Sequence, residues 1–135
     1  MKPRQPHINV SCAIIEKDGR ILAAQRSEEM AMPLKWEFPG GKVEPHESAA
    51  TCLEREIREE LGAEIRIVAS LPPTKWSYPN FTITLYPFVC HLNDGKLHLT
   101  EHRAVCWIRP EKLPNLDWAE ADVPVLRNYF SYLKR

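Results

Sequence analysis

The sequence has no surplus of charge of either sign, because eighteen basic and eighteen acidic side chains cancel over its 135 residues. Without a basic field that attracts a polyanion, a nucleic acid polymer is disfavoured as the substrate. The sequence also has no run of 18 apolar residues and no apolar signal-peptide core near position 1. We therefore expect neither a membrane span nor secretion.

Repeats, low-complexity tracts and linker-like segments are also absent. A chain of this length can bury a hydrophobic core of its own, so we expect one domain over residues 1–135. The four cysteines form no C-x-x-C pair and lie among apolar neighbours, and the five histidines show no ligand spacing. This pattern predicts buried free thiols, a reducing cytoplasm and no zinc site.

Alternating and β-branched segments predict a chain that is mostly strand. Strands are expected at Ile8–Glu16, Ile21–Gln25, Ile65–Ser70, Lys75–Ser77, Phe81–Leu92 and Ala104–Ile108. A short strand that ends in a glycine turn is expected at Trp36–Gly41. A hairpin turn is expected at Asn93–Gly95, before a short strand near Leu97–Leu99. Residues 27–35 have no period and predict a loop.

Two helices are expected among these strands. Ser48 is a good N-cap for the first, and Gly62 is a natural residue to follow its end. The second opens at residues 122–124, with proline in its first turn, and runs to position 133. Strands around one helix with a second helix following predict an α/β fold, in which a mixed sheet is covered on both sides.

Three glutamates, Glu56, Glu59 and Glu60, stand at positions i, i+3 and i+4 of the first helix. They share one face, where like charges repel, and a bound divalent cation would remove that repulsion. Mg²⁺ binds through a few carboxylates while it keeps waters and substrate phosphates in its shell. The alternative is an ordinary solvated helix face that is rich in glutamate and arginine.

The spacing of the surrounding residues favours the metal site. Residues 41–62 follow the pattern G-x5-E-x7-R-E-U-x-E-E-x-G, with U apolar, through Gly41, Glu47, Arg55, Glu56, Ile57, Glu59, Glu60 and Gly62. Since each residue type has a usage of about 5–7%, a chance match is rarer than roughly one in a million. The pattern resembles the Nudix box, and the adjoining WEFPGGK segment is similar to the MutT-type branch of that family. Ala63 departs from the family, which usually carries a larger aliphatic residue there.

This resemblance implies an α/β/α sandwich and the hydrolysis of a nucleoside diphosphate that is linked to another group. It implies that Glu56, Glu59 and Glu60 bind Mg²⁺, or Mn²⁺ in its place, and that the Gly40 carbonyl completes the metal shell. Cations held there would bridge phosphate oxygens and acidify a bound water. Gly41 and Gly62 are expected to serve the structure of the motif.

Two residues are candidates for the base that activates the attacking water, Glu56 and Glu101. Similar enzymes carry an acidic residue near position 101 that approaches the metals. The Glu101–His102 pair before Trp107 also resembles a CTP pyrophosphohydrolase subgroup. A solvated loop glutamate is the alternative for Glu101.

Arg55 is expected to pair with Glu47 across about two turns and to orient the loop against the helix. Positive charge for the phosphates is expected from Arg26, where MutT-type proteins carry an arginine on the α- or β-phosphate, and from Lys42. A role at the surface end of a strand is the alternative for Arg26.

Base recognition is expected at Asp122, because by similarity the residue that opens the last helix meets the base. An N-cap role alone would also explain an aspartate there. As an anion, Asp122 only accepts hydrogen bonds, which suits the exocyclic amine of cytosine or guanine N1–H and N2–H. Phe38 and Trp118, or else Trp76 or Tyr78, can stack on a base, and core packing is the alternative for each.

The leading prediction is a Mg²⁺-dependent hydrolase of nucleoside triphosphates, giving monophosphate and pyrophosphate. Substrates of (d)CTP type or oxidised purine nucleotides such as 8-oxo-dGTP are expected, with a role in cleaning the nucleotide pool, and the protein is expected to be a monomer or homodimer. Hydrolysis of ADP-ribose or another nucleoside diphosphate sugar is an alternative, although such enzymes often carry longer N-terminal extensions. A catalytically silent Nudix-fold sensor is another, but those proteins lose box glutamates that this chain keeps.

Overall fold

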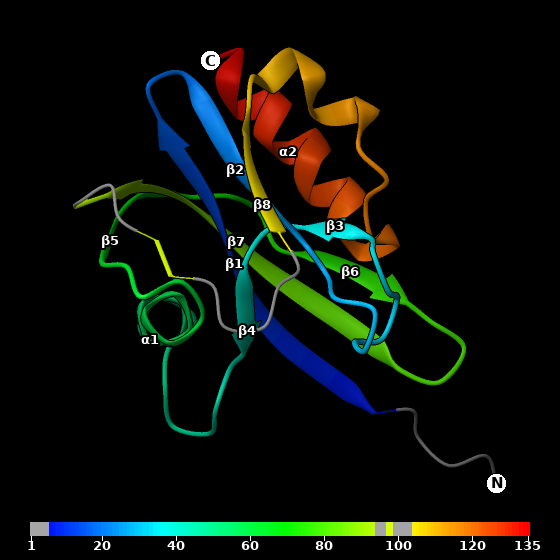
Figure 1. Ribbon diagram of the computed structural model, residues 1–135. Coiled ribbons are helices and arrows are strands. Elements are labelled where there is room, and N and C mark those ends of the chain that lie inside the picture. Colours follow the sequence, from blue (N-terminus) through cyan, green and yellow to red (C-terminus); the bar gives the residue numbers. More distant parts are fainter. Residues whose placement is uncertain (1–5, 94–96, 99–103) are drawn as a thin grey trace, which may run out of the picture.

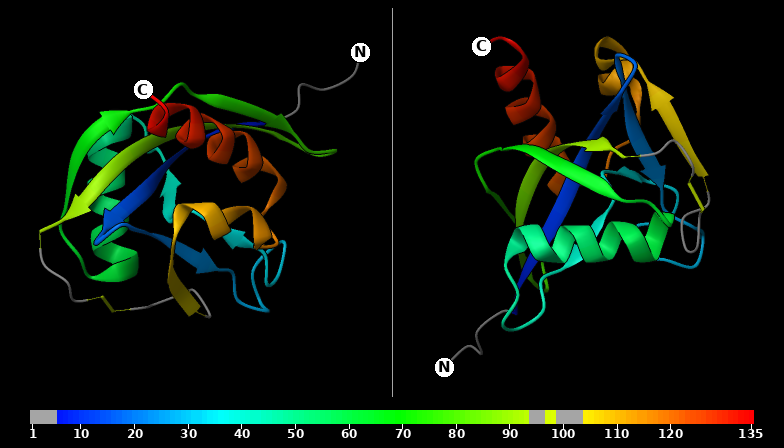
Figure 2. Two further views of the ribbon diagram at one scale, coloured as in Figure 1. Left: turned by 90° about the horizontal axis from the view of Figure 1, so that it is seen from above. Right: turned by 90° about the vertical axis from the view of Figure 1, so that its left-hand side faces the viewer.

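The computed structural model describes residues 6–93, 97–98 and 104–135, in which a mixed β-sheet lies between two α-helices. Helix α1 (Ala49–Leu61) covers one face of the sheet and α2 (Val123–Leu133) covers the other (Figures 1 and 2). The predicted α/β/α sandwich is therefore confirmed. No helix in the ranges above is both long enough and apolar enough to cross a bilayer.

The strands follow the predicted order along the chain. They are β1 (His7–Lys17), β2 (Arg20–Gln25), β3 (Trp36–Glu37), β4 (Gly40–Lys42), β5 (Ile65–Ser70), β6 (Thr74–Ser77), β7 (Thr82–Leu92) and β8 (Ala104–Ile108). The sheet has the order β3-β2-β1-β7-β5, while β4 pairs with β1, β6 with β7 and β8 with β2. Strands β1 and β7 run parallel from the pair His7–Thr82 to the pair Glu16–His91, and the other pairs are antiparallel.

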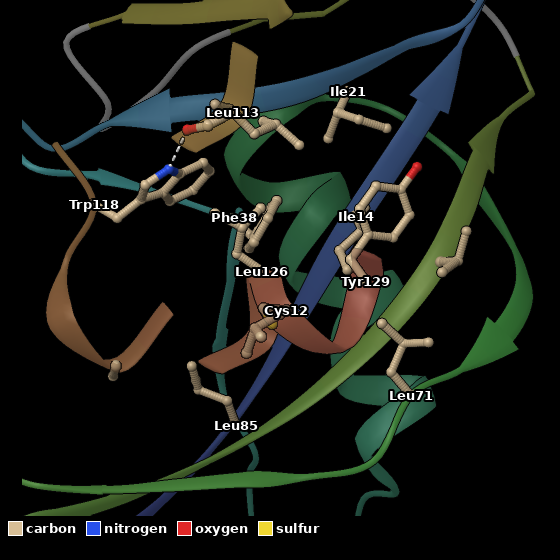
Figure 3. Packing of buried hydrophobic residues seen from close by; sticks show 14 residues of the cluster. Cys12, Ile14, Ile21, Phe38, Leu71, Leu85, Leu113, Trp118, Leu126 and Tyr129 are labelled. Carbon is tan, nitrogen blue, oxygen red and sulfur yellow. Dashed lines mark hydrogen bonds between the residues drawn. The ribbon is translucent and has the colours of Figure 1, made fainter. Parts of the chain in front are cut away.

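Strand β1 supplies side chains to both halves of the core, because successive residues of a strand point to opposite faces. Cys12 and Ile14 join the cluster that contains Tyr129 of α2, shown in Figure 3. Ala13 and Ile15 join the cluster on the other face, with the apolar stripe of α1. That stripe consists of Leu53, Ile57 and Leu61, all fully buried as the helical period predicts. Burial on both faces explains why residues 12–15 of β1 form a continuous apolar run.

Both ends of α1 are capped as the sequence predicts. The Ser48 hydroxyl accepts a hydrogen bond from the Thr51 N–H at 3.1 Å, which satisfies one free donor of the first turn. Gly62 has a left-handed φ of 62° and donates its N–H to the Arg58 carbonyl at 3.0 Å. The carboxylates of the last two turns are therefore held on a helix with a defined start and end.

The WEFPGG segment differs from its prediction as one strand that ends in a glycine turn. Gly40 opens β4, which pairs with β1 in the register Cys12–Gly40. A Cβ on Gly40 would lie 1.9 Å from the Ser11 carbonyl oxygen, so glycine serves a close approach of two backbones here. The glycine pair therefore fixes β4 against the centre of the sheet instead of reversing the chain.

The segment after β7 also differs from its prediction. Leu97 and His98 are not in a strand, so the short strand expected there is wrong for these two residues. The His98 N–H instead donates to the Leu61 carbonyl at 2.7 Å and satisfies a free acceptor at the end of α1. The remainder of the expected hairpin and Leu99 lie outside the described residues. Two short 3₁₀ helices, η1 (Pro110–Asn115) and η2 (Glu120–Asp122), were not expected.

Candidate active site

A cavity of about 400 Å³ opens between β1, β4, the strands β6–β7, the loop at residues 27–35 and the segment that precedes α2. Eight residues considered for the site from the sequence border it: Arg26, Phe38, Gly40, Gly41, Lys42, Glu60, Asp122 and the alternative stacking candidate Tyr78. These positions are spread over nearly a hundred residues of sequence, and the sheet brings them together. The cavity is the candidate active site.

The acidic end of the site is built by α1 against β4. Glu60 borders the cavity, and the Glu56 side chain packs directly on the backbone of Gly41. A Cβ on Gly41 would lie 2.2 Å from the Glu56 carboxyl carbon, so only glycine leaves room for this carboxylate. Glu59, on the same helix, has a side chain that is 61% exposed. The i, i+3, i+4 spacing thus gives three carboxylates at one edge of α1, at different depths.

The predicted ion pair between Arg55 and Glu47 is present, and it belongs to a larger network. The Arg55 guanidinium contacts Glu47 at 2.7 Å, Glu56 at 2.8 Å and Glu59 at 3.4 Å. It also donates to the Lys42 carbonyl at 3.3 Å. The Arg55 hydrogen bond lowers the pKa of Glu47 to about 2. Arg55 therefore joins the loop that contains Glu47 to α1, and it offsets the negative charges of Glu56 and Glu59.

Asp122 borders the same cavity from the segment that precedes α2 and is only 7% exposed. Its Oδ2 accepts a hydrogen bond from the Phe38 N–H at 2.9 Å, and its side chain makes no capping bond to α2. Asp122 therefore occupies the N-cap position of α2 without capping the helix through its side chain, so the N-cap alternative does not explain an aspartate there. Burial, and then the charge of Glu37, raises the pKa of Asp122 to about 8. Near neutral pH it is mainly a neutral acid that both donates and accepts, and not the anion assumed from the sequence.

The aromatic residues divide between the cavity and the core. Phe38 borders the cavity, while Trp118 packs against Phe38 at a ring distance of 4.7 Å and does not line it (Figure 3). The indole N–H of Trp118 donates to the Leu113 carbonyl at 2.7 Å, which fixes the ring in the core. Tyr78 and Phe81 form a stacked pair on the cavity, with centroids 4.9 Å apart. Tyr78 was one of the sequence candidates, whereas Phe81 was assigned only to a strand.

Arg26 borders the cavity, but its guanidinium is already engaged. Nη1 contacts Glu37 at 2.6 Å, and Nε donates to the Ala31 carbonyl at 2.5 Å. Lys42 also borders the cavity and lies beside Gly41. Glu37 was not singled out from the sequence, although it precedes the FPGG segment directly; nothing in its spacing distinguishes it from a surface glutamate.

A second cavity, of about 670 Å³, lies between the β1–β2 hairpin and α2 and contains none of the predicted site residues. Glu16 in its wall accepts a hydrogen bond from the Tyr129 hydroxyl at 2.6 Å and lies 3.0 Å from His91 Nε2. Burial and the Glu16 carboxylate raise the pKa of Tyr129. We interpret this cluster as a tie between α2 and two central strands.

Comparison with known proteins identifies the family. Residues 5–129 match the model of the NUDIX domain. The chain belongs to the Nudix family. It is 40% identical to the CTP pyrophosphohydrolase of Escherichia coli K12 over 126 residues, which cover 92% of each chain. It is 33% identical to the 8-oxo-dGTP diphosphatase of Proteus vulgaris over 106 residues, which cover 78% of this chain and 92% of that one.

Solved structures agree with this Nudix assignment. The solution structure of the E. coli ORF135 protein has a TM-score of 0.82 and 38% identity, and the match covers 96% of this chain and 92% of that one. The crystal structure of a MutT protein from Methanosarcina mazei has a TM-score of 0.88 at 23% identity, covering 99% and 100% of the two chains, and supports the fold. The predicted family and fold are confirmed.

Nudix hydrolases generally use a divalent metal, and the donors present here suit one. The Glu56 carboxyl packs on Gly41 of β4, and Glu60 borders the same cavity as Gly40 and Gly41, so carboxylate oxygens of the kind that Mg²⁺ prefers lie at β4. Within the described ranges, however, no three acidic, histidine or cysteine side chains already form a metal-binding group. Arg55 is instead paired with Glu56 and Glu59. The other catalytic candidate, Glu101, lies outside the described residues.

Proposed function

We propose that this Nudix protein hydrolyses nucleoside triphosphates to nucleoside monophosphates and pyrophosphate, with Mg²⁺ as its cofactor and Mn²⁺ able to replace it. The observation that carries the proposal is that one cavity borders both Glu60, at the acidic edge of α1, and Asp122, beside the aromatic pair. A nucleotide needs these two environments, one for its phosphates and one for its base. The CTP pyrophosphohydrolase and 8-oxo-dGTP diphosphatase relatives support the same reaction class.

The acidic end would serve the polyphosphate. The attacking water must reach a phosphorus shielded by negative oxygens, so neutralising and positioning charge dominate catalysis. Mg²⁺ held by Glu56, Glu59 and Glu60 supplies positive charge opposite those oxygens when it is bound. Lys42 adds a cation at the same end of the cavity. The proton of the attacking water passes to Glu56 or to Glu101.

The protonation state of Asp122 favours a cytosine base. A neutral carboxyl can donate its O–H to cytosine N3 while its other oxygen accepts from the exocyclic amine. Guanine presents two donors, N1–H and N2–H, and so prefers a carboxylate. Because the pKa of Asp122 is raised to about 8, the neutral form predominates at pH 7. A (d)CTP-type nucleotide is therefore the favoured substrate, and oxidised purine nucleotides are the second choice.

We assign this reaction to the cytoplasm and to the cleaning of the nucleotide pool. All four cysteines are free thiols, three of them buried, which suits a reducing compartment. The thiols of Cys12 and Cys90 have pKa values raised by burial, so neither is poised as a nucleophile.

A pyrophosphate-release screen tests the proposal. Normal and oxidised nucleoside triphosphates are compared with ADP-ribose at pH 7, with Mg²⁺ and with Mn²⁺, and the protein with Glu60→Gln is the control. We expect pyrophosphate from triphosphates, with CTP or dCTP among the highest specificity constants. Hydrolysis of ADP-ribose without pyrophosphate release from any triphosphate would contradict the proposal. In the same assay, Glu56→Gln and Glu101→Gln are compared over pH, because loss of the general base removes its pKa from the rate profile.

A further inference from the structure

Arg26 has more contacts with its own loop than its place at the end of β2 requires. Its backbone N–H donates to the Lys35 carbonyl at 2.9 Å, and its carbonyl accepts from the Leu34 N–H at 3.1 Å. Its Nε donates to the Ala31 carbonyl, and its Nη1 forms the ion pair with Glu37. One residue therefore ties the middle and the end of residues 27–35 to β3.

This loop needs an external support. Met32 and Leu34 have left-handed φ angles of 50° and 64°, which non-glycine residues disfavour. The bonds within the loop itself are long or involve sulfur: Met30 N–H donates to the Ser27 carbonyl at 3.3 Å, Ser27 N–H to the Met30 sulfur at 3.3 Å, and Lys35 N–H to the Met32 carbonyl at 3.4 Å. Met30 and Met32 nevertheless border the cavity. A strained segment keeps two flexible apolar side chains at the site because Arg26 holds its backbone.

The partner of Arg26 extends the connection to Asp122. Glu37 borders the cavity, and the next residue, Phe38, gives its N–H to the Asp122 carboxyl. The ion-paired side chains of Arg26 and Glu37 are only 18% and 17% exposed. Moving the guanidinium to a phosphate would break this largely buried ion pair beside Asp122, which is costly at such low exposure.

We propose that Arg26 is a positioning residue for the base, which holds the 27–35 loop and the Glu37–Phe38 segment around Asp122, and that it is not a ligand of the phosphates. This inference rests on the proposed triphosphate hydrolysis and changes the role that the family resemblance implied for Arg26. The cationic contact to the phosphates then falls to Lys42, which forms no ion pair with another described residue and borders the same cavity as Glu60. Selectivity between bases, and not affinity for pyrophosphate, depends on Arg26.

The test compares two ligands that report on different ends of the site. CTP and UTP differ only at the base edge, so the ratio of their kcat/KM values reports on base positioning. The inhibition constant of pyrophosphate, the product without a base, reports on the phosphate end. Both are measured for Arg26→Gln, Arg26→Lys and Glu37→Gln. Lys42→Ala is the positive control for the phosphate end, and Arg58→Gln, which breaks the Arg58–Glu64 ion pair outside the cavity, is the matched control.

We expect Arg26→Gln and Glu37→Gln each to change the CTP/UTP ratio by about tenfold or more, mainly through KM, because each breaks the same pair. The pyrophosphate inhibition constant should stay within about twofold. Arg26→Lys should recover part of the selectivity, since it keeps the charge opposite Glu37 but loses the bond to Ala31.

Two results would overturn the inference. One is an equal loss of kcat/KM for CTP and UTP in Arg26→Gln together with a raised pyrophosphate inhibition constant. The other is an opposite effect of Glu37→Gln, namely tighter pyrophosphate binding by a released Arg26. If Arg26→Gln does not fold, Glu37→Gln and Arg26→Lys still distinguish the two roles. Absence of triphosphate hydrolysis by the wild-type protein would instead refute the proposed function.

Discussion

Replacement of Asp122 by asparagine should stabilise the protein near neutral pH. Asparagine keeps an acceptor for the Phe38 N–H, and it carries no proton that must be bound on folding. Wild-type Asp122 has a pKa of about 8 when folded, against 3.8 for an ordinary aspartate. Between these values the folded state holds a proton that the unfolded state has released. The contribution of Asp122 to stability is therefore complete below pH 3.8 and is lost as the pH rises toward 8.

The magnitude follows from this pH interval. From pH 3.8 to pH 7, each unit costs the wild-type protein about 1.4 kcal/mol, which amounts to about 4 kcal/mol. Asp122 borders a cavity that water enters, and hydration of the carboxyl lowers this value. We expect Asp122→Asn to raise the free energy of unfolding at pH 7 by about 2–4 kcal/mol, and the melting temperature by at least about 5 °C.

Urea unfolding of both proteins at intervals from pH 4 to pH 8 measures this difference. The stability gained by Asp122→Asn should grow with pH across the series. Asp117→Asn is the matched control, because Asp117 is 73% exposed and its ion pair with Lys35 contributes little. Parallel stability curves for wild type and Asp122→Asn would refute the reasoning, since they would mean that Asp122 is ionised in the folded protein.

Three further predictions concern Glu60 of α1, the glycine pair of β4 and the support of α2. Glu60→Gln should lower turnover by at least about 100-fold with little change in melting temperature, because one ligand charge is lost; near-normal turnover at saturating Mg²⁺ would remove Glu60 from the site. Gly41→Ala should reduce activity at a small cost in stability, because the new Cβ displaces the Glu56 carboxyl. Gly40→Ala should lower the unfolding free energy by about 1–3 kcal/mol, because its Cβ collides with the backbone of Ser11. Equal melting temperatures for the two variants would contradict this difference. Tyr129→Phe should cost about 1–3 kcal/mol in chemical denaturation by removing the bond to Glu16, and an unchanged midpoint would show that this bond contributes nothing.

Regular elements were predictable where one physical rule dominated. The caps of α1 and its stripe of Leu53, Ile57 and Leu61 depend on local chemistry and on a 3.6-residue period, and both are present. Strand β1 was predictable because buried β-branched residues favour a strand. Gly40 was wrongly predicted to lie in a turn, because glycine is needed there for a close contact with the backbone of β1 at Ser11, which is 29 positions earlier in the chain.

The site was predictable at the level of the motif but not at the level of its charges. The spacing in residues 41–62 indicates which carboxylates gather on α1. It contains no information about Glu37, whose role arises from contact with Arg26 and from its place beside Asp122. The raised pKa of Asp122 likewise comes from burial beneath segments that are distant in sequence. Long-range environment, and not residue type, decided these properties.

The parallel pairing of β1 with β7 has a consequence for how the molecule acquires its structure. His7 pairs with Thr82, so the first strand must wait for a partner that is 75 positions later in the chain (82 − 7 = 75). Contacts of such high sequence separation close large loops and slow folding. During synthesis, the helix that carries Glu56, Glu59 and Glu60 is therefore completed before the β1–β7 ladder can form. Nascent chains that end before residue 82 should contain β1 and β4, on which that helix packs, but lack the parallel partner of β1.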